Sequence, residues 1–316
     1  MTDHAHGHGH AHGHGHAHHH HHHRPESYDR VFALAIALNL AFVGFEGAAG
    51  FVANSLALVA DAGHNLGDVL GLALAWGAAA LARRRPTLRR TYGYGRSSVL
   101  AALVNAMILL VAVGAIGMEA VTRLVRPAPV EGAMMIWVAA AGVLLNGTTA
   151  SLFMAGRKHD LNLRGAFLHM AADAGVSLGV VVAGLLIGVT GWLWLDPATS
   201  LLIVAVIAIG TWGLFRDSLD LALDAVPEAI DREQVESWLR ALPGVTEVHD
   251  LHIWAISTTE TALTAHLVRP GAPAEDSFLA RVSTELKERF MIGHATLQIE
   301  IGDGEHPCHL APADVV

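Results

Sequence analysis

Six stretches of the sequence are apolar along most of their length, and short polar stretches separate them. They lie at roughly 31–53, 56–82, 98–121, 133–156, 163–190 and 195–215. A helix needs about 20 consecutive, mostly apolar residues to cross a bilayer. The pattern therefore predicts an α-helical membrane protein with six transmembrane helices.

The pattern changes after Arg216, where shorter periodic segments replace the apolar runs. The expected elements are helices at Asp231–Leu242 and Glu275–Phe290, and strands at Glu247–Ser257, Thr261–Arg269 and Ala295–Ile301. Their order, α-β-β-α-β, suits a small α+β domain with helices on one face of a sheet.

Composition agrees with this division and adds a third region. Hydrophobic residues make up 53% of the chain and charged residues only 16%, as expected of a membrane protein. Thirteen of the 22 histidines lie in the first 23 residues, among Gly and Ala. Such a segment has little apolar surface to bury, so we expect a disordered cytoplasmic arm that collects metal weakly. A purification tag is the alternative for His18–His23.

We accordingly divide the chain into four parts. They are the His-rich arm (1–30), the six-helix transmembrane domain (31–216), the small α+β domain (217–305) and a flexible tail (306–316).

Charge predicts the orientation in the membrane. The 83–97 loop has six arginines and the 157–164 loop has three basic residues, whereas the alternate loops have fewer. By the positive-inside rule the basic loops are cytoplasmic, and with six spans both termini are cytoplasmic too. The short loops favour a bacterial inner membrane. From Asp217 onward 18 acidic residues face 6 basic ones, which argues against nucleic acid as a partner.

Two transmembrane segments contain the same His-x-x-x-Asp spacing. His64 and Asp68 lie in the second segment, and His169 and Asp173 in the fifth. Residues four apart project from the same face of a helix, so two such helices would present two imidazoles and two carboxylates to one point. Ionisable groups inside a span are costly and usually functional. The alternative is an Asp–His hydrogen bond between helices without a metal.

The ligand types point to the metal and to its counter-ion. Imidazole with carboxylate favours Zn2+ over Mg2+, Ca2+ or Mn2+, with Co2+ and Cd2+ as further cargo. Metal binding needs neutral imidazoles and ionised carboxylates, so it competes with protons. We therefore expect exchange of metal for protons. Glu46 and Asp61 lie near the predicted external ends of the first two segments and are interpreted as hydrogen-bonding or vestibule groups, with metal ligands as the alternative. Asp61, three residues before His64, is close enough in helical phase to act on that imidazole.

Several motifs make the chain resemble the cation diffusion facilitator family, in its zinc-transporting branch. The resemblance covers nearly everything after residue 30 and is strongest at Ser55–Asp68, Thr91–Arg96, Leu100–Asn105, Asn162–Asp173 and His249–Trp254. It implies six transmembrane helices, a homodimer, and metal/proton antiport by alternating access. It further implies that residues 217–305 form a cytoplasmic ferredoxin-like domain for metal binding and dimerisation. It also implies the transport site His64, Asp68, His169 and Asp173.

Other histidines suggest metal sites in the C-terminal domain. The family pattern groups His249, His266 and Glu300 at a cytoplasmic Zn2+ site, with surface or core histidines as the alternative. If the first strand is flat, His249 and His252 face opposite ways, so we expect His252 to pack or to donate a hydrogen bond. His294, His306, Cys308 and His309 are candidates for a further site, or else belong to a flexible polar tail.

Two functions remain open from the sequence. The first is Zn2+ efflux from the cytoplasm by proton antiport. The second is a membrane-bound zinc sensor or buffer without transport. A zinc hydrolase would need an open coordination position and a general base, so four protein ligands argue against an enzyme.

Overall fold

The computed structural model describes residues 26–154, 161–271, 275–302 and 308–311, without the side chains of 26–38, 161–163 and 166. It contains two compact units, Met1–Leu38 and Asn39–Val316, and every contact reported below lies within the second. The predicted metal-collecting arm from His4 to His23 falls outside the described residues, as does His306.

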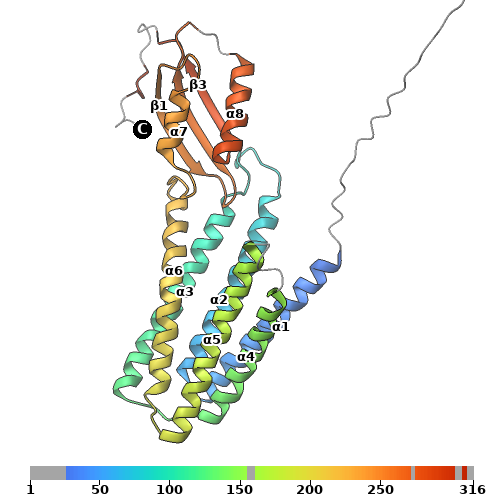
Figure 1. Ribbon diagram of the computed structural model, residues 1–316, viewed down its shortest axis with the longest axis vertical. Helices are drawn as coiled ribbons and strands as arrows, with labels where there is room; N and C mark the ends of the chain where they lie inside the picture. The colour runs from blue at the N-terminus through green and yellow to red at the C-terminus, as the bar shows by residue number, and fades with distance from the viewer. Residues whose placement is uncertain (1–25, 155–160, 272–274, 303–307, 312–316) are drawn as a thin grey trace, which may run out of the picture. The chain divides into compact units, whose positions relative to one another are not determined.

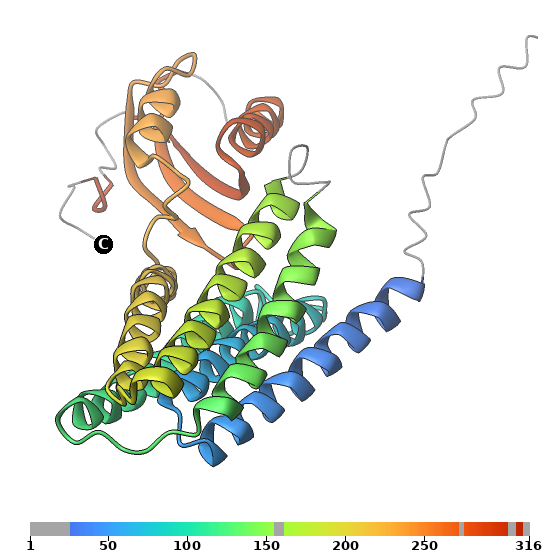
Figure 2. The ribbon, with the colours of Figure 1, turned by 60° about the horizontal axis from the view of Figure 1, so that its bottom comes forward.

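Six long helices come first in the chain (Figures 1 and 2). They are α1 (Glu26–Val52), α2 (Leu56–Ala82), α3 (Ser97–Val125), α4 (Gly132–Phe153), α5 (Leu161–Thr190) and α6 (Leu195–Ala222). Five of them, α2 to α6, are long and apolar enough to cross a membrane, and the stretch Asn39–Val52 of α1 is apolar but shorter. The chain is therefore an integral membrane protein with several apolar helices.

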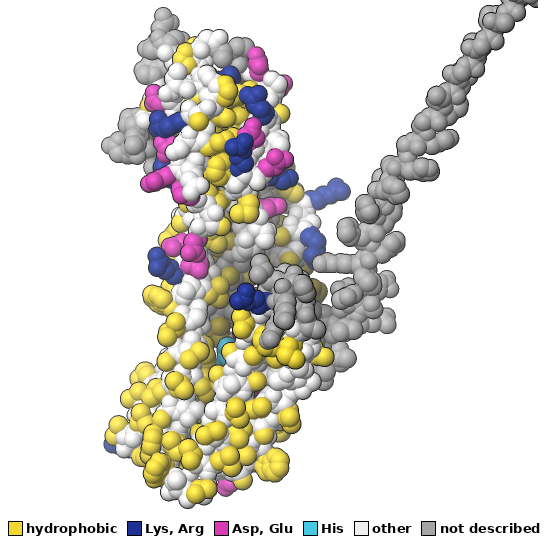
Figure 3. Space-filling view, viewed as in Figure 1, with side chains coloured by type: hydrophobic (Ala, Val, Ile, Leu, Met, Phe, Trp, Pro, Cys, Tyr) yellow, Lys and Arg dark blue, Asp and Glu magenta, His cyan; other side chains and the backbone are white. Residues whose placement is uncertain are grey.

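These helices bury small side chains and expose large apolar ones. Ala57 and Ala139 are fully buried in the core between the helices, whereas Trp137 and Trp212 are 77% and 60% exposed. Apolar side chains cover much of the helical surface, and acidic and basic ones gather on the C-terminal domain (Figure 3). A continuous apolar exterior is the reverse of a water-soluble surface and fits contact with lipid tails.

Helix α2 begins at a point where α6 supplies the missing hydrogen-bond acceptors. Asp196 of α6, which is fully buried, accepts hydrogen bonds from Ser55 Oγ (2.5 Å), Leu56 N (2.8 Å) and Ala57 N (3.2 Å). The first amides of a helix have no partner inside the helix, so such acceptors stabilise its start. This contact fixes the end of α2 from which His64 follows.

The C-terminal domain has the predicted α-β-β-α-β order. Its elements are α7 (Arg232–Arg240), β1 (Glu247–Ala255), β2 (Thr261–Val268), α8 (Asp276–Phe290) and β3 (Ile292–Glu300). The sheet order is β1-β2-β3, with β1 antiparallel and β3 parallel to β2. β3 starts earlier than predicted, because Ile292 is buried in the core directly after α8.

Both helices of this domain cover one face of the sheet. Leu263, Ala265 and Leu267 alternate along β2 and share a core with Val235 of α7 and Val282 of α8. Because side chains alternate along a strand, the residues between them, including His266, project from the opposite face.

Strand β1 is not flat, so His249 and His252 do not face opposite ways as they would in a flat strand, although His252 stays outside the cluster that contains His249. The register shifts between them: His249 lies opposite His266, and His252 lies opposite Thr264. Asp250, inside the shift, has a positive φ of 49°. A bulge adds one residue to the strand, which turns both histidines to the face away from the helices. His252 donates or accepts a hydrogen bond with Asp250 at 2.9 Å, in line with the role expected for it.

Candidate functional site

The four ionisable residues predicted for the transport site come together between α2 and α5. His64 Nε2 lies 3.2 Å from Asp173 Oδ1, and His169 Nε2 lies 3.1 Å from Asp68 Oδ2. Within each helix the His-to-Asp distances are longer, 3.8 Å on α2 and 3.6 Å on α5. Each imidazole therefore faces a carboxylate of the other helix, and the site requires both helices.

This tetrad is closed on one side and open on the other. The side chain of Asp173 is 3% exposed, whereas those of Asp68 and His169 are 39% and 44% exposed. Ligand atoms of His64, Asp68 and Asp173 lie within 4.8 Å of one another. Two imidazole nitrogens and two carboxylates form a set that Zn2+ accepts in tetrahedral geometry, and the exposed side gives such an ion a way in.

Polar side chains next to the tetrad form hydrogen bonds with the two remaining acidic groups. Ser177 Oγ on α5 donates to Asp61 Oδ2 at 2.9 Å, and Asn65 Nδ2 on α2 donates to Glu46 Oε2 at 3.2 Å. Both acidic residues thus have the hydrogen-bonding role expected from the sequence. Asp61 is also within electrostatic range of His64.

A second cluster lies on the helix-free face of the C-terminal sheet. His249 Nε2 is 3.4 Å and His266 Nδ1 is 2.9 Å from the carboxylate of Glu300. The sulfur of Cys308 is 3.4 Å from His266 Nδ1. Ligand atoms of these four residues all lie within 4.8 Å of one another, and nitrogen, oxygen and sulfur donors in that number suit Zn2+.

Cys308 joins this cluster and not the separate tail site considered from the sequence. His294 is six positions before Glu300 on β3, or about 20 Å along a strand, and its ring instead contacts Tyr92 at a centroid distance of 5.6 Å. His309, next to Cys308, is exposed. The structure therefore does not bring His294 and Cys308 to one site.

Sequence reasoning also missed Asp250, which supports the cluster from within the bulge. Its Oδ2 lies 3.4 Å from His266 Nε2, while its Oδ1 contacts His252. A group that contacts the second nitrogen of a metal-binding imidazole fixes the orientation of the ring. Its place directly after His249 was visible in the sequence, but its direction depends on the bulge.

The charge state of Glu300 suits a ligand. Burial alone would raise its pKa, but hydrogen bonds from Gln298 and Cys308 and the nearby imidazoles of His249 and His266 outweigh burial and lower the pKa below its usual value. The carboxylate is therefore ionised at neutral pH, as metal binding requires.

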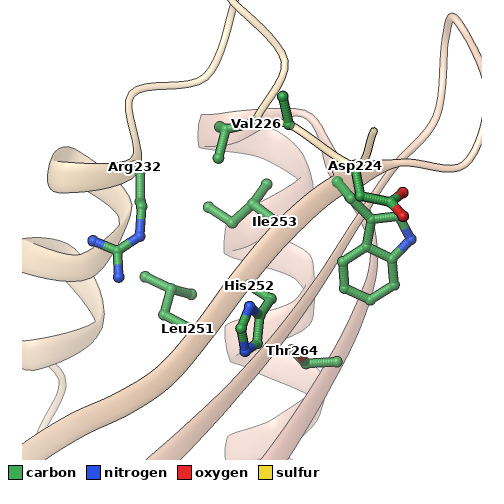
Figure 4. Close-up of a pocket in the computed structure, with 9 residues that line it drawn as sticks. Asp224, Val226, Arg232, Leu251, His252, Ile253 and Thr264 are labelled. Atoms are coloured by element: carbon green, nitrogen blue, oxygen red, sulfur yellow. The ribbon is translucent and has the colours of Figure 1, made fainter. Parts of the chain in front are cut away.

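The C-terminal domain also has an open pocket of about 510 Å³, lined in part by Arg232, His252 and Thr264 (Figure 4). Its ionisable side chains already have partners. Arg232 pairs with Glu236, His252 with Asp250, and Asp224 with Arg96. This pocket therefore provides no further ligand set.

The basic loop before α3 contacts the C-terminal domain. Arg96 forms an ion pair with Asp224, which follows α6, and Ser98 Oγ accepts a hydrogen bond from Thr258 N at 3.1 Å. The loop thus links the helices to the sheet.

Comparison with known families assigns both parts of the chain. Residues 32–221 match the "Cation efflux transmembrane domain" and residues 227–301 match the "Cation efflux protein, cytoplasmic domain".

Similar proteins are bacterial metal transporters. The "Metal cation efflux system protein CzcD" of Cupriavidus metallidurans is 37% identical over 92% of this chain and 90% of its own length. The "Zinc transporter ZitB" of Escherichia coli is 36% identical over 87% of each chain. The "Cadmium, cobalt and zinc/H(+)-K(+) antiporter" of Bacillus subtilis is 31% identical over 88% of this chain and 90% of its own length. A solved metal-bound C-terminal domain of the CzcD transporter is 38% identical and covers 22% of this chain and 99% of its own, with a TM-score of 0.21.

Proposed function

The chain belongs to the cation efflux, or cation diffusion facilitator, family of transporters, and from that premise we propose that it exports Zn2+ from the cytoplasm in exchange for protons. The family is one of transporters and not of enzymes. The observation that supports the proposal most strongly is the tetrad of His64, Asp68, His169 and Asp173 within two apolar helices.

The donor set supports Zn2+ as the first cargo. Two imidazoles exclude the metals that prefer all-oxygen sites, and two carboxylates balance the charge of a divalent ion. Co2+ and Cd2+ accept the same donors and are further cargo. The names of the relatives, which include zinc, cobalt and cadmium transporters, agree with this range.

Protons are the proposed counter-ion because they compete for the same atoms. The imidazoles and carboxylates bind either metal or protons, and histidine titrates close to physiological pH. A site that opens alternately to the two sides of the membrane then releases metal where protons are plentiful and binds it where they are scarce.

The rest of the proposed architecture follows the family. We place α1 as a sixth span, both termini in the cytoplasm, and the protein as a homodimer in a bacterial inner membrane. Residues 31–216 form the transport domain and 217–305 a ferredoxin-like domain. His249, His266, Glu300 and Cys308 hold a resident Zn2+ there, whose charge offsets acidic repulsion between paired domains. The arm (1–30) and tail (306–316) are accessory.

Transport by reconstituted protein tests the proposal. In proteoliposomes with an imposed pH gradient, the parent chain should accumulate radioactive zinc, and Asp173→Ala should not, because a charged ligand is lost. Asp217→Ala removes an exposed carboxyl of α6 and should transport like the parent. Zinc binding without uptake by the parent would favour the sensor or buffer instead. Uptake by Asp173→Ala at the parental rate would refute the tetrad.

A further inference from the structure

Two acidic side chains lie beside the transport tetrad but belong to neither metal cluster. Glu46 on α1 and Asp61 on α2 are both 0% exposed, and their carboxyl groups are within hydrogen-bonding range of each other. Because both side chains are fully buried within apolar helices, water does not stabilise their ionised forms.

Each carboxyl has one satisfied oxygen and one that lacks a donor. Asn65 donates to Glu46 Oε2 and Ser177 donates to Asp61 Oδ2. The other two oxygens, Glu46 Oε1 and Asp61 Oδ1, are buried and have no hydrogen-bond partner. Two neighbouring carboxyl groups thus each retain a buried oxygen without a hydrogen-bond donor, and a proton on one of the two groups would supply such a donor.

The charges around the pair do not neutralise it. The other titratable groups that act on Asp61 are His64 on the same helix and Asp173 on α5. Within the described residues, no Lys or Arg forms an ion pair with Glu46 or Asp61. The imidazole of His64 therefore stands against three carboxyl groups, those of Glu46, Asp61 and Asp173.

Two ionised carboxylates at such a place are strongly disfavoured. Burial penalises the charged form of each, and each penalises the other by repulsion. One shared proton removes both penalties and supplies the missing donor, as in other pairs of adjacent carboxyl groups.

We propose that Glu46 and Asp61 share one proton while the transport site is free of metal, and release it to water when a divalent cation binds at the tetrad. Asp61 precedes His64 by less than one helical turn, and a nearby cation favours the ionised form of a carboxyl group. The step converts one carboxylic acid and one carboxylate into two carboxylates and a free proton. This inference rests on the proposed function and adds a proton-binding site outside the metal ligands.

Infrared spectroscopy of the full-length protein in lipid vesicles tests the shared proton directly. The metal-free parent at neutral pH should show the C=O stretching band of a protonated carboxylic acid. The band should disappear when Zn2+ is added and should be absent from Glu46→Gln. A metal-free parent without such a band, or a band unaffected by both Zn2+ and Glu46→Gln, would overturn the proposal.

Calorimetry in buffers of different ionisation enthalpy counts the protons released. The parent should release one more proton per bound zinc than either Glu46→Gln or Asp61→Asn. Ser177→Ala, which removes a donor but no titratable group, should match the parent. Equal counts for the parent and a carboxyl variant that binds zinc would sink the idea. Failure of the parent to bind zinc at the tetrad would instead refute the proposed function, so the two failures are distinguishable.

Discussion

Asp196→Ala should weaken the whole transport domain, although Asp196 is not a ligand. The carboxyl group accepts three hydrogen bonds at the start of α2, from Ser55, Leu56 and Ala57. Leu56 and Ala57 are 6% and 0% exposed, so water does not replace the lost acceptor at either amide. The variant also removes these contacts between α6 and the helix that contains His64 and Asp68.

The size of the effect follows from the two amides. A buried donor without a partner costs about 1–3 kcal/mol, and loss of an N-terminal cap about 1 kcal/mol. With partial relaxation we expect a destabilisation of about 3 kcal/mol, or roughly 6–12 °C in unfolding temperature for a chain of this size. Asp196→Asn keeps one oxygen acceptor and should lose about half as much.

The assay is thermal unfolding of detergent-solubilised protein, followed by circular dichroism. Asp217→Ala on the same helix is the control, because its side chain is exposed. Zinc affinity of the folded Asp196→Ala protein should stay within a few-fold of the parent. An unfolding temperature equal to that of Asp217→Ala would refute the reasoning, and so would loss of zinc binding without loss of stability.

Two further predictions concern the C-terminal domain. Backbone and side-chain hydrogen bonds from Gln234 lower the pKa of Asp231 at the start of α7. The ionised carboxylate therefore stabilises the fold at neutral pH, and this stabilisation is lost as the pH falls through the lowered folded-state pKa. The difference in unfolding temperature between the parent and Asp231→Asn should shrink on acidification, and a constant difference would contradict this. In an Asp173→Ala background, Cys308→Ser should weaken Zn2+ binding by about tenfold or more and Cd2+ binding further. Competition with a chromophoric chelator measures both affinities, and the control His309→Ala should bind both metals like the parent. Parental affinities in Cys308→Ser would count against the sulfur ligand.

The tetrad shows how far spacing alone can predict a site. His64 with Asp68 and His169 with Asp173 each follow from the helical repeat, so a shared face within each helix was predictable. The cross-helix contacts, such as the 3.1 Å between His169 and Asp68, depend on how α2 and α5 pack. The family resemblance supplied that step, because local periodicity contains no information about neighbouring helices.

Cys308 and Glu46 show what could not be predicted. Cys308 follows the last strand in a segment without periodicity, so its return to His266 was invisible, and a grouping with His294 was equally open. Glu46 was expected to form a hydrogen bond, but its contact with Asp61 depends on how α1 meets α2. In both residues the chemistry was evident from the sequence, and the partner came only from tertiary packing.

Asp250 is the single extra residue in β1, and it interrupts the alternation of core-facing and outward-facing side chains without reversing it. Before the shift, Val248 faces the core and His249 faces outward; after it, Leu251 faces the core and His252 faces outward. Deleting Asp250 would leave one continuous alternation in which Val248 and Leu251 still face the core and His249 and His252 still face outward. The strand would lose the bulge and the carboxylate that contacts His252 and His266. A deletion in a flat part of the strand, by contrast, would move the residues on one side of it to the other face. Where a homologous sequence is one residue shorter here, the gap in the alignment therefore belongs at Asp250.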